Sequence, residues 1–193
     1  MVSIAACHAV DRSSILLGTA NFFMTKKDPC MTTPNYDFSK DLPIAKKTEK
    51  QIAEYLVNSQ KMKFIGTSDT IRGVRRSDFD IRMAFPSGKE VDIEIKEDFS
   101  CARTGNVGVE CESWGRASGI AISKADFYLY KVHQPDGTKR VYIIRTNKLK
   151  EMIEQELYHR IVVGGDPGSN SKNYLFKLKV IMDNFTHLGK LES

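Results

Sequence analysis

Apolar and polar residues alternate in two adjacent segments near the middle of the chain. In residues 79–85, Phe, Ile, Met and Phe alternate with Asp, Arg and Ala, and in residues 91–96, Val, Ile and Ile alternate with Asp, Glu and Lys. Side chains of a strand point to opposite faces with a period of two, so the pattern predicts two β-strands with one apolar face each. The intervening Pro86–Gly88 is typical of a tight turn. The sequence therefore predicts a β-hairpin over residues 77–98.

A helix is predicted ahead of this hairpin, and further strands and helices are predicted after it. Ile52 and Leu56 lie on one apolar stripe at helical spacing within residues 44–58. The remaining pattern predicts strands near 62–65, 107–112, 127–132, 140–145 and 174–180, and helices near 123–126 and 148–160. This order predicts an α/β domain with a mixed central β-sheet flanked by helices.

The chain of 193 residues has the length of one folded domain with an extension. Residues 1–34 differ from the rest in composition and include Met31, a second plausible start that precedes a segment that would make a natural amino terminus. We expect residues 1–34 to be either a poorly ordered extension or a stretch ahead of the true start. The folded domain is predicted at 35–193.

Composition narrows the function classes only slightly. A formal net charge of +5 is compatible with a polyanionic partner, although many proteins are as basic. The four cysteines show neither CxxC pairing nor zinc-type spacing with histidines, which argues against a zinc site and for reduced thiols. No apolar run reaches the length of about 18 residues that a transmembrane helix needs. We therefore expect no membrane partner and a cytoplasmic location.

The polar face of the predicted hairpin carries the candidate chemistry. Glu94 and Lys96 share one strand face, and Asp80 lies across the hairpin from them. Two carboxylates and an ammonium group on one patch suit metal-assisted phosphodiester hydrolysis, in which carboxylate oxygens bind Mg²⁺ and a cation faces the phosphate or the attacking water. A half-exposed hairpin also carries such residues on its solvent face, so the spacing alone does not decide between the two interpretations.

The order of motifs resembles the PD-(D/E)xK nuclease superfamily, and its phage-type members in particular. Glu49 lies in a helix ahead of the sheet, Asp80 opens the hairpin, and Glu94-Ile95-Lys96 lies on the next strand. The segment from Thr104 to Asp126 is similar to a block found in phage nucleases of this kind. The resemblance covers about residues 40–150 and implies a restriction-endonuclease-like core with Mg²⁺ as cofactor, for which Mn²⁺ substitutes.

By this resemblance each motif residue has an expected role. Asp80 and Glu94 would bind the metal, with the main-chain carbonyl of Ile95 as a further ligand. Lys96 would be the catalytic cation that orients the attacking water or the scissile phosphate. Glu49 would complete the site from the helix, or it would instead cap the helix after Thr48.

Further residues are secondary candidates. Asp78 and Asp80 of the Ser77–Asp80 motif are expected on the same strand face, so either carboxylate could be the ligand, although the alternation that follows favours Asp80. Asn106 and Glu110 lie on the polar face of the predicted strand 107–112, which a simple meander would place beside Glu94 and Lys96. Three basic residues are candidates for contacts with the DNA backbone: Arg103, Lys124 and Arg116.

The favoured hypothesis is a Mg²⁺-dependent DNA endonuclease, phage-encoded and acting in the host cytoplasm. It would be site-specific in the manner of homing enzymes or junction-resolving, and it would act as a homodimer or higher homo-oligomer. One alternative is a nucleotidyltransferase, because Gly66–Ser68 followed by Ser77–Asp80 resembles that signature, with Asp92 or Glu94 as the third carboxylate. The other alternative is a non-catalytic DNA-binding module on the same fold.

Overall fold

The computed structural model describes residues 38–75, 78–164 and 170–191, with side chains from residue 42 onward. The extension predicted at 1–34 lies outside the described residues. The elements in chain order are α1 Phe38–Gln60, β1 Lys63–Thr67, β2 Ile81–Ala84, β3 Glu90–Asp98, α2 Cys101–Thr104, β4 Asn106–Ser113, β5 Arg116–Ala117, the 3₁₀ turn η1 Gly119–Ala121, β6 Phe127–His133, β7 Lys139–Arg145, α3 Thr146–Glu154, β8 Arg160–Val163, β9 Ser171–Lys177, α4 Leu178–Asn184 and β10 Thr186–Leu191.

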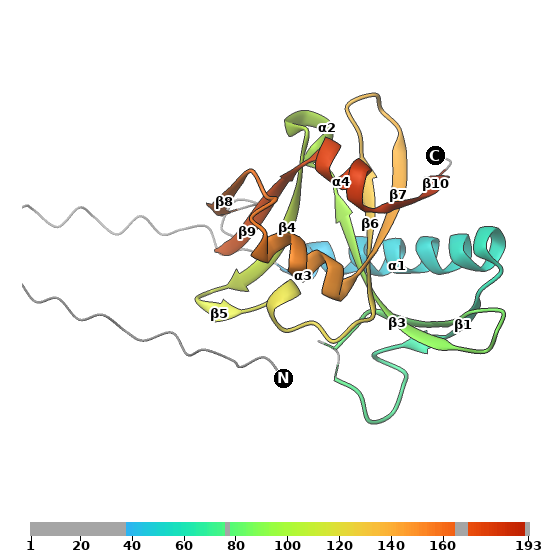
Figure 1. Ribbon diagram of the computed structural model, residues 1–193. Coiled ribbons are helices and arrows are strands. Elements are labelled where there is room, and N and C mark those ends of the chain that lie inside the picture. The colour runs from blue at the N-terminus through green and yellow to red at the C-terminus, as the bar shows by residue number, and fades with distance from the viewer. Residues whose placement is uncertain (1–37, 76–77, 165–169, 192–193) are drawn as a thin grey trace, which may run out of the picture. The chain divides into compact units, whose positions relative to one another are not determined.

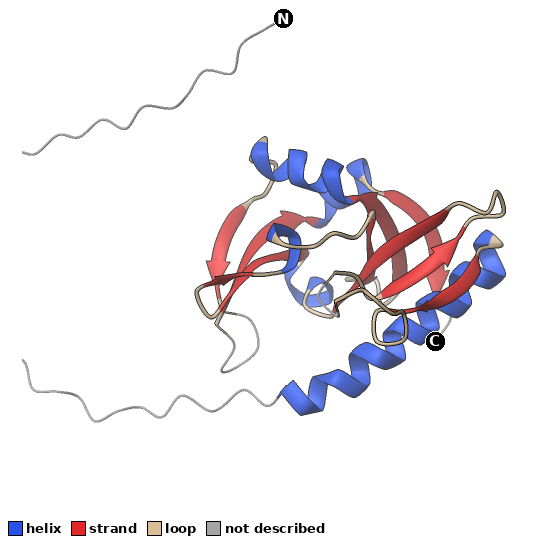
Figure 2. Ribbon diagram, turned by 90° about the horizontal axis from the view of Figure 1, so that it is seen from below, coloured by secondary structure: helices blue, strands red, loops and turns tan. Residues whose placement is uncertain are grey.

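The strands form two sheets, and the larger one is mixed (Figure 1). Its order is β1-β2-β3-β6-β7-β10, in which β3 and β6 run parallel and the other neighbours run antiparallel. The smaller sheet has the order β5-β4-β9-β8. Helices lie on both sides of the strands (Figure 2). The predicted α/β domain with a mixed sheet flanked by helices is thus confirmed.

The two faces of the larger sheet are buried in separate cores. On one face, Ile52 and Leu56 of α1 pack against Ile93 and Ile95 of β3 and Leu129 of β6. On the other face, apolar residues of β6 and β7 pack against α3, α4 and the smaller sheet. Strand alternation explains this division, because β3 gives its odd-numbered residues to α1 and directs its even-numbered residues away from it.

The prediction of which strand lies beside β3 is wrong. The strand predicted at 107–112 is β4, which belongs to the smaller sheet, whereas β3 lies between β2 and β6. A parallel pair needs a crossover of a dozen or more residues, and the chain from Phe99 to Asp126 makes that crossover. The segment that sequence order placed beside Glu94 and Lys96 is therefore part of the crossover.

The carboxyl-terminal elements also differ from the prediction. The helix expected over 148–160 ends at Glu154, just before Glu156 takes a left-handed φ of 55°, and Arg160–Val163 forms β8 instead. The strand expected over 174–180 ends at Lys177, and α4 and β10 follow. The helix expected near 123–126 is absent, and η1 lies just ahead of that position.

Candidate active site

Asp80 lies immediately before β2 and is bonded to β3 through both its main chain and its side chain. Its N–H donates to the carbonyl of Ile93 (3.1 Å), and its Oδ2 accepts the N–H of Ile95 (2.7 Å). Within a strand, main-chain groups two residues apart point to the same edge, so the N–H and C=O of Ile95 point toward the side that holds Asp80. The Asp80 carboxylate and the Ile95 carbonyl therefore share the edge of β3 at which β2 begins.

Glu94 and Lys96 lie on the face of β3 turned away from α1, as the alternation predicts. Lys96 Nζ is 2.6 Å from Glu94 Oε1, and the side chain of Glu94 is 12% exposed whereas that of Lys96 is 40% exposed. In the parallel pairing with β6, Glu94 is opposite Tyr128 and Lys96 is opposite Tyr130. The mostly buried carboxylate of Glu94 thus has its counter-ion two residues along the same strand.

Burial and the neighbouring charges alter the ionisation of Asp80 and Lys96. Burial, followed by repulsion from Glu94, raises the pKa of Asp80 from 3.8 to about 7. The Lys96 ammonium and the Ile95 N–H act in the opposite direction without offsetting the rise. Burial also lowers the pKa of Lys96, but Glu94 and Asp80 together outweigh burial and raise that pKa above its ordinary range. The site therefore has an excess of negative charge that a bound cation would relieve.

Glu49 approaches the same region from α1. It is buried in the middle of the helix, far from its start at Phe38, so a capping role is wrong. Lys46 Nζ lies 2.9 Å from Glu49 Oε2 and 3.0 Å from Oδ2 of Asp69, a residue in the loop after β1. Repulsion from Glu49 also raises the pKa of Asp80, but its effect is smaller than that of burial or of repulsion from Glu94. The Glu49 carboxylate is therefore near the cluster but engaged by an ammonium group.

Glu49, Asp80 and Lys96 line a cavity of about 790 Å³ between α1 and the start of β2, and Glu94 is outside its lining. Its charged lining consists of Lys46, Glu49, Asp69, Asp80, Lys96 and Glu97. Carboxylates outnumber ammonium groups in this lining by four to two. A polyanionic strand can approach such a lining only when added cations neutralise it.

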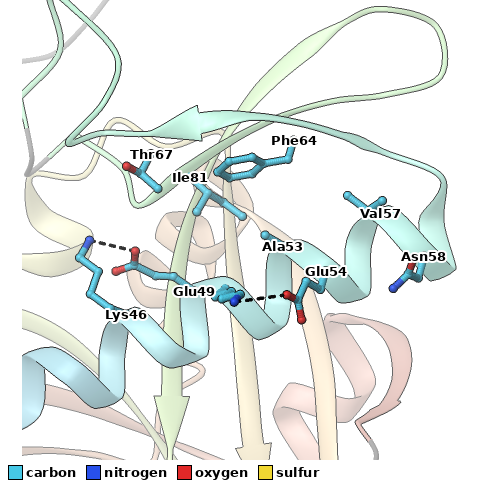
Figure 3. Close-up of a pocket in the computed structure, with 10 residues that line it drawn as sticks. Lys46, Glu49, Ala53, Glu54, Val57, Asn58, Phe64, Thr67 and Ile81 are labelled. Carbon is cyan, nitrogen blue, oxygen red and sulfur yellow. Dashed lines mark hydrogen bonds and ion pairs between the residues drawn. The ribbon is translucent and has the colours of Figure 1, made fainter.

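A second pocket of about 480 Å³ adjoins this cavity, on the side of α1 facing β1 (Figure 3). Ala53, Val57 and Phe64 give it an apolar lining, and Asp80, Glu94 and Lys96 are outside that lining. In Figure 3 the Glu49 carboxylate points toward Lys46, at the end of this pocket. The pocket is therefore lined by one predicted site residue, Glu49, whereas the larger cavity is lined by Glu49, Asp80, Ile95 and Lys96.

A network of ion pairs and hydrogen bonds lies beside the cluster, on the α1 face of β3. Glu97 accepts from Lys131 Nζ at 2.8 Å, bonds His133 Nε2 at 2.7 Å, and accepts the hydroxyl of Thr48. Lys131 also donates to Gln51 of α1 at 2.9 Å. Burial raises the pKa of Glu97, but these partners outweigh burial and hold it below its usual range. The network joins α1, β3 and β6 next to Glu49.

The secondary acidic candidates lie away from the cluster. Asp78 precedes β2 in a turn, where Oδ2 accepts the N–H of Arg75 (3.3 Å) and Oδ1 lies 3.4 Å from Lys124 Nζ. The expectation that Asp78 and Asp80 share a strand face is wrong, because β2 begins only at Ile81. Asp78 is thus paired with Lys124, and neither residue lines the cavity.

Asn106 and Glu110 lie on β4, away from β3. The amide of Asn106 donates to the carbonyl of Thr104 (3.0 Å). Glu110 accepts the hydroxyls of Ser118 (2.5 Å) and Ser171 (2.9 Å). These contacts fix the loop after β4, where a Cβ on Gly119 would lie 2.4 Å from the Glu110 carbonyl. Both residues therefore stabilise the crossover.

The three basic candidates are exposed and lie on different elements. Arg103 is in α2, Arg116 is in β5, and Lys124 follows η1 with its side chain 68% exposed. Tyr128, Lys46 and Asp69 are residues near the cluster that the sequence did not indicate. Lys46 is one helical turn from Glu49, whereas Tyr128 and Asp69 reach the site through contacts between distant segments.

Two side-chain carboxylates and one carbonyl are the donors that could hold a metal. Asp80, Glu94 and the Ile95 carbonyl supply oxygen, which Mg²⁺ prefers. Within the described part of the chain, no group of three or more His, Cys, Asp or Glu side chains is arranged to hold an ion. Any metal here would therefore rely on two carboxylates, the carbonyl and water.

Comparison with known proteins adds no relative. No protein-family model matches the chain, and a search of curated proteins returned no match. Across 38–75, 78–164 and 170–191, no helix is long and apolar enough to cross a membrane. The cytoplasmic location remains a prediction.

Asp80→Asn should stabilise the folded chain by an amount that grows with pH. The pKa of Asp80 is about 7 in the folded chain and 3.8 in the unfolded chain. Between about pH 4 and pH 7 the unfolded chain therefore releases this proton more readily, so the parent loses stability as the pH rises and does not regain it above pH 7. Asparagine cannot ionise, yet its oxygen still accepts the Ile95 N–H. We expect the difference in unfolding free energy between variant and parent to grow by about 2 kcal/mol from pH 5 to pH 8, measured by urea unfolding with EDTA.

Asp183→Asn is the control for the substitution itself, because that carboxylate is on α4 with its side chain 55% exposed. A stability difference for Asp80→Asn that stays constant across this pH range would show that Asp80 is not the buried, repelled carboxyl described above.

Proposed function

We propose that the chain is a Mg²⁺-dependent DNA endonuclease of the PD-(D/E)xK type, which hydrolyses phosphodiester bonds. The observation that carries this proposal is the 2.7 Å bond from the Ile95 N–H to Asp80 Oδ2. This bond places the Asp80 carboxylate beside Ile95, the middle residue of the Glu94-Ile95-Lys96 triplet. A solvated hairpin face does not require this contact, whereas a metal shared by the Asp80 carboxylate and the Ile95 carbonyl requires the two to be close together.

The donor set fits Mg²⁺. Asp80, Glu94 and the Ile95 carbonyl are hard oxygen ligands, and the remaining positions are left to water and substrate, as is usual for this ion. Bound Mg²⁺ would lower the pKa of a coordinated water and withdraw charge from the phosphate. The excess negative charge around Asp80 supports the same assignment, since a cation would hold that carboxylate ionised.

Lys96 would act on the anionic reactants. Its ammonium is 2.6 Å from Glu94 and partly exposed to the cavity that Asp80 also lines. From there it orients the attacking water or a phosphate oxygen, and it stabilises the charge that develops on the phosphate. Glu49 is engaged by Lys46, so we assign it a supporting role in holding Lys46 at the cavity edge.

The nucleotidyltransferase alternative requires both Asp78 and Asp80 at one metal. Asp78 is paired with Lys124, whereas Asp80 accepts the N–H of Ile95, and this difference favours the nuclease over the transferase. The non-catalytic module would leave the Asp80, Glu94 and Lys96 cluster without a role. DNA as partner, the homo-oligomer, and the phage and host-cytoplasm context remain parts of the proposal.

Incubation with supercoiled plasmid tests the proposal. The parent should nick or linearise the DNA with Mg²⁺ or Mn²⁺ and should not do so with EDTA. Asp80→Asn should abolish cleavage, whereas Asp78→Asn should lower it by less than about 10-fold, because only Asp80 contacts the triplet.

The other outcomes assign the alternatives. Loss of activity with Asp78→Asn and not with Asp80→Asn would move the site along the chain. A comparable loss with both variants would favour the paired carboxylates that the transferase requires. DNA binding without cleavage under any metal would favour the module.

A further inference from the structure

One wall of the cavity that holds Asp80 and Lys96 is apolar and exposed. Leu42 and Ile44 come from the first turns of α1, and Phe99 follows β3. These three side chains are 45%, 49% and 55% exposed, although they lie in the same cavity as four carboxylates. A site that needed only a metal and a phosphate would have no use for this wall.

The Phe99 ring is held in place from one side. Its centroid is 4.5 Å from that of the His133 ring, with the two planes inclined by 36°. His133 is in turn fixed by the 2.7 Å bond from Nε2 to Glu97 in the buried network. A ring supported in this way loses little conformational entropy when a flat ligand covers its exposed part.

Spacing links the apolar wall to the charged cluster. Phe99 and Lys96 both line this cavity and lie three residues apart in the sequence, so their Cα atoms are about 10 Å apart at most. This span is comparable with one nucleotide, from its phosphate to the far edge of its base. The cavity therefore has a charged end and an apolar end, as a nucleotide does.

The base faces of an intact duplex are covered by their stacked neighbours, so a duplex cannot present one to Phe99. Unpaired bases, in contrast, stack readily on exposed aromatic side chains. Resting on the proposed nuclease function, we propose that the cavity binds an unpaired nucleotide of DNA, with its phosphate at Asp80 and Lys96 and its base on Phe99 beside Leu42 and Ile44. The substrate is then DNA with a single-stranded segment at the cut.

Cleavage of matched oligonucleotides tests this inference with the full chain and Mg²⁺. One sequence is offered as a single strand, as a blunt duplex, and as a duplex with a single-stranded flap. The parent should cut the single strand or the flap at least about 10-fold faster than the duplex. Phe99→Ala should slow that cleavage by about 10-fold, within the range for removing one base-stacking contact, and Phe99→Trp should restore it.

A second measurement reports on stacking without cleavage. A single strand carrying 2-aminopurine, with Ca²⁺ in place of Mg²⁺, should lose fluorescence on binding to the parent and less so on binding to Phe99→Ala. Phe85→Ala is the matched control, because Phe85 is 37% exposed in the turn at the other end of the hairpin and lies outside the cavity lining.

The outcomes separate the two proposals. If no DNA form is cut with Mg²⁺ or Mn²⁺, the nuclease proposal fails. If DNA is cut but the duplex is preferred, or Phe99→Ala cuts the single strand at the parent rate, only the unpaired-nucleotide inference is overturned. A change in oligomeric state with Phe99→Ala, without a change in DNA preference, would make the wall a contact between copies of the chain and would overturn it equally.

Discussion

Glu94→Gln should reduce single-turnover DNA cleavage by about 10³-fold while leaving the fold intact. The substitution keeps the shape of the side chain but removes an anionic metal ligand, and it also removes the partner that lies 2.6 Å from Lys96 Nζ. Losses of about 10²- to 10³-fold are typical for one charge-stabilising group, and this change affects two groups at once. DNA binding should persist or tighten, because one charge that repels phosphate is gone.

Glu90→Gln is the matched control for this experiment. Glu90 lies on the same strand and the same face, four residues before Glu94, with its side chain 54% exposed and its nearest cation, Arg82, at 4.0 Å. It should cut DNA at the parent rate. Parent-rate cleavage by Glu94→Gln itself would remove this carboxylate from the chemistry.

Lys96→Met should slow the hydrolytic step by about 10²-fold or more at saturating Mg²⁺. Methionine keeps an aliphatic stem of similar length and deletes the charge that we propose orients water or phosphate. Mg²⁺ affinity should stay the same or rise, because an ammonium that repels the ion has been removed from beside Glu94. Single-turnover cleavage measures the first effect, and Mg²⁺ titration of DNA binding measures the second.

Lys89→Met, in the exposed turn of the same hairpin, controls for the loss of one positive charge near DNA. If Lys96→Met cleaves within about twofold of the parent, the lysine is a solvated strand residue. Its loss would then change stability by no more than about 0.5 kcal/mol.

The parts of the site that the sequence predicted are those formed by local pairing. The hairpin brings Asp80 toward Glu94 and Lys96 because the alternation and the short turn fix the register over a few residues. α1 was predicted from its apolar stripe, although it begins earlier than expected. No comparable pattern shows that Asp80 bonds the Ile95 N–H, since that contact forms only because β2 begins at the next residue.

The parts that the sequence did not predict depend on distant segments. Parallel pairing of β3 with β6 brings Lys131 and His133 to Glu97, and these residues come from a strand beyond the crossover. α4 was read as the end of a strand because its residues are apolar and β-branched in part. Tertiary contacts override that tendency, since the Leu178 N–H donates to Gly105 and Ile181 is fully buried.

Lys96 and Glu97, adjacent on β3, point to opposite faces of the sheet, and this makes the register of the strand unusually costly to change. A slip of one residue would move Glu97 toward the face that holds Glu94 and would bring Lys96 beneath α1, beside Lys131. Two ammonium groups would then lie together where a buried ion pair now stands, and breaking such a pair typically costs about 3–5 kcal/mol. Misregistered chains are thus penalised by charge as well as by packing, so chains that fold fully have Glu94 and Lys96 on the face turned away from α1.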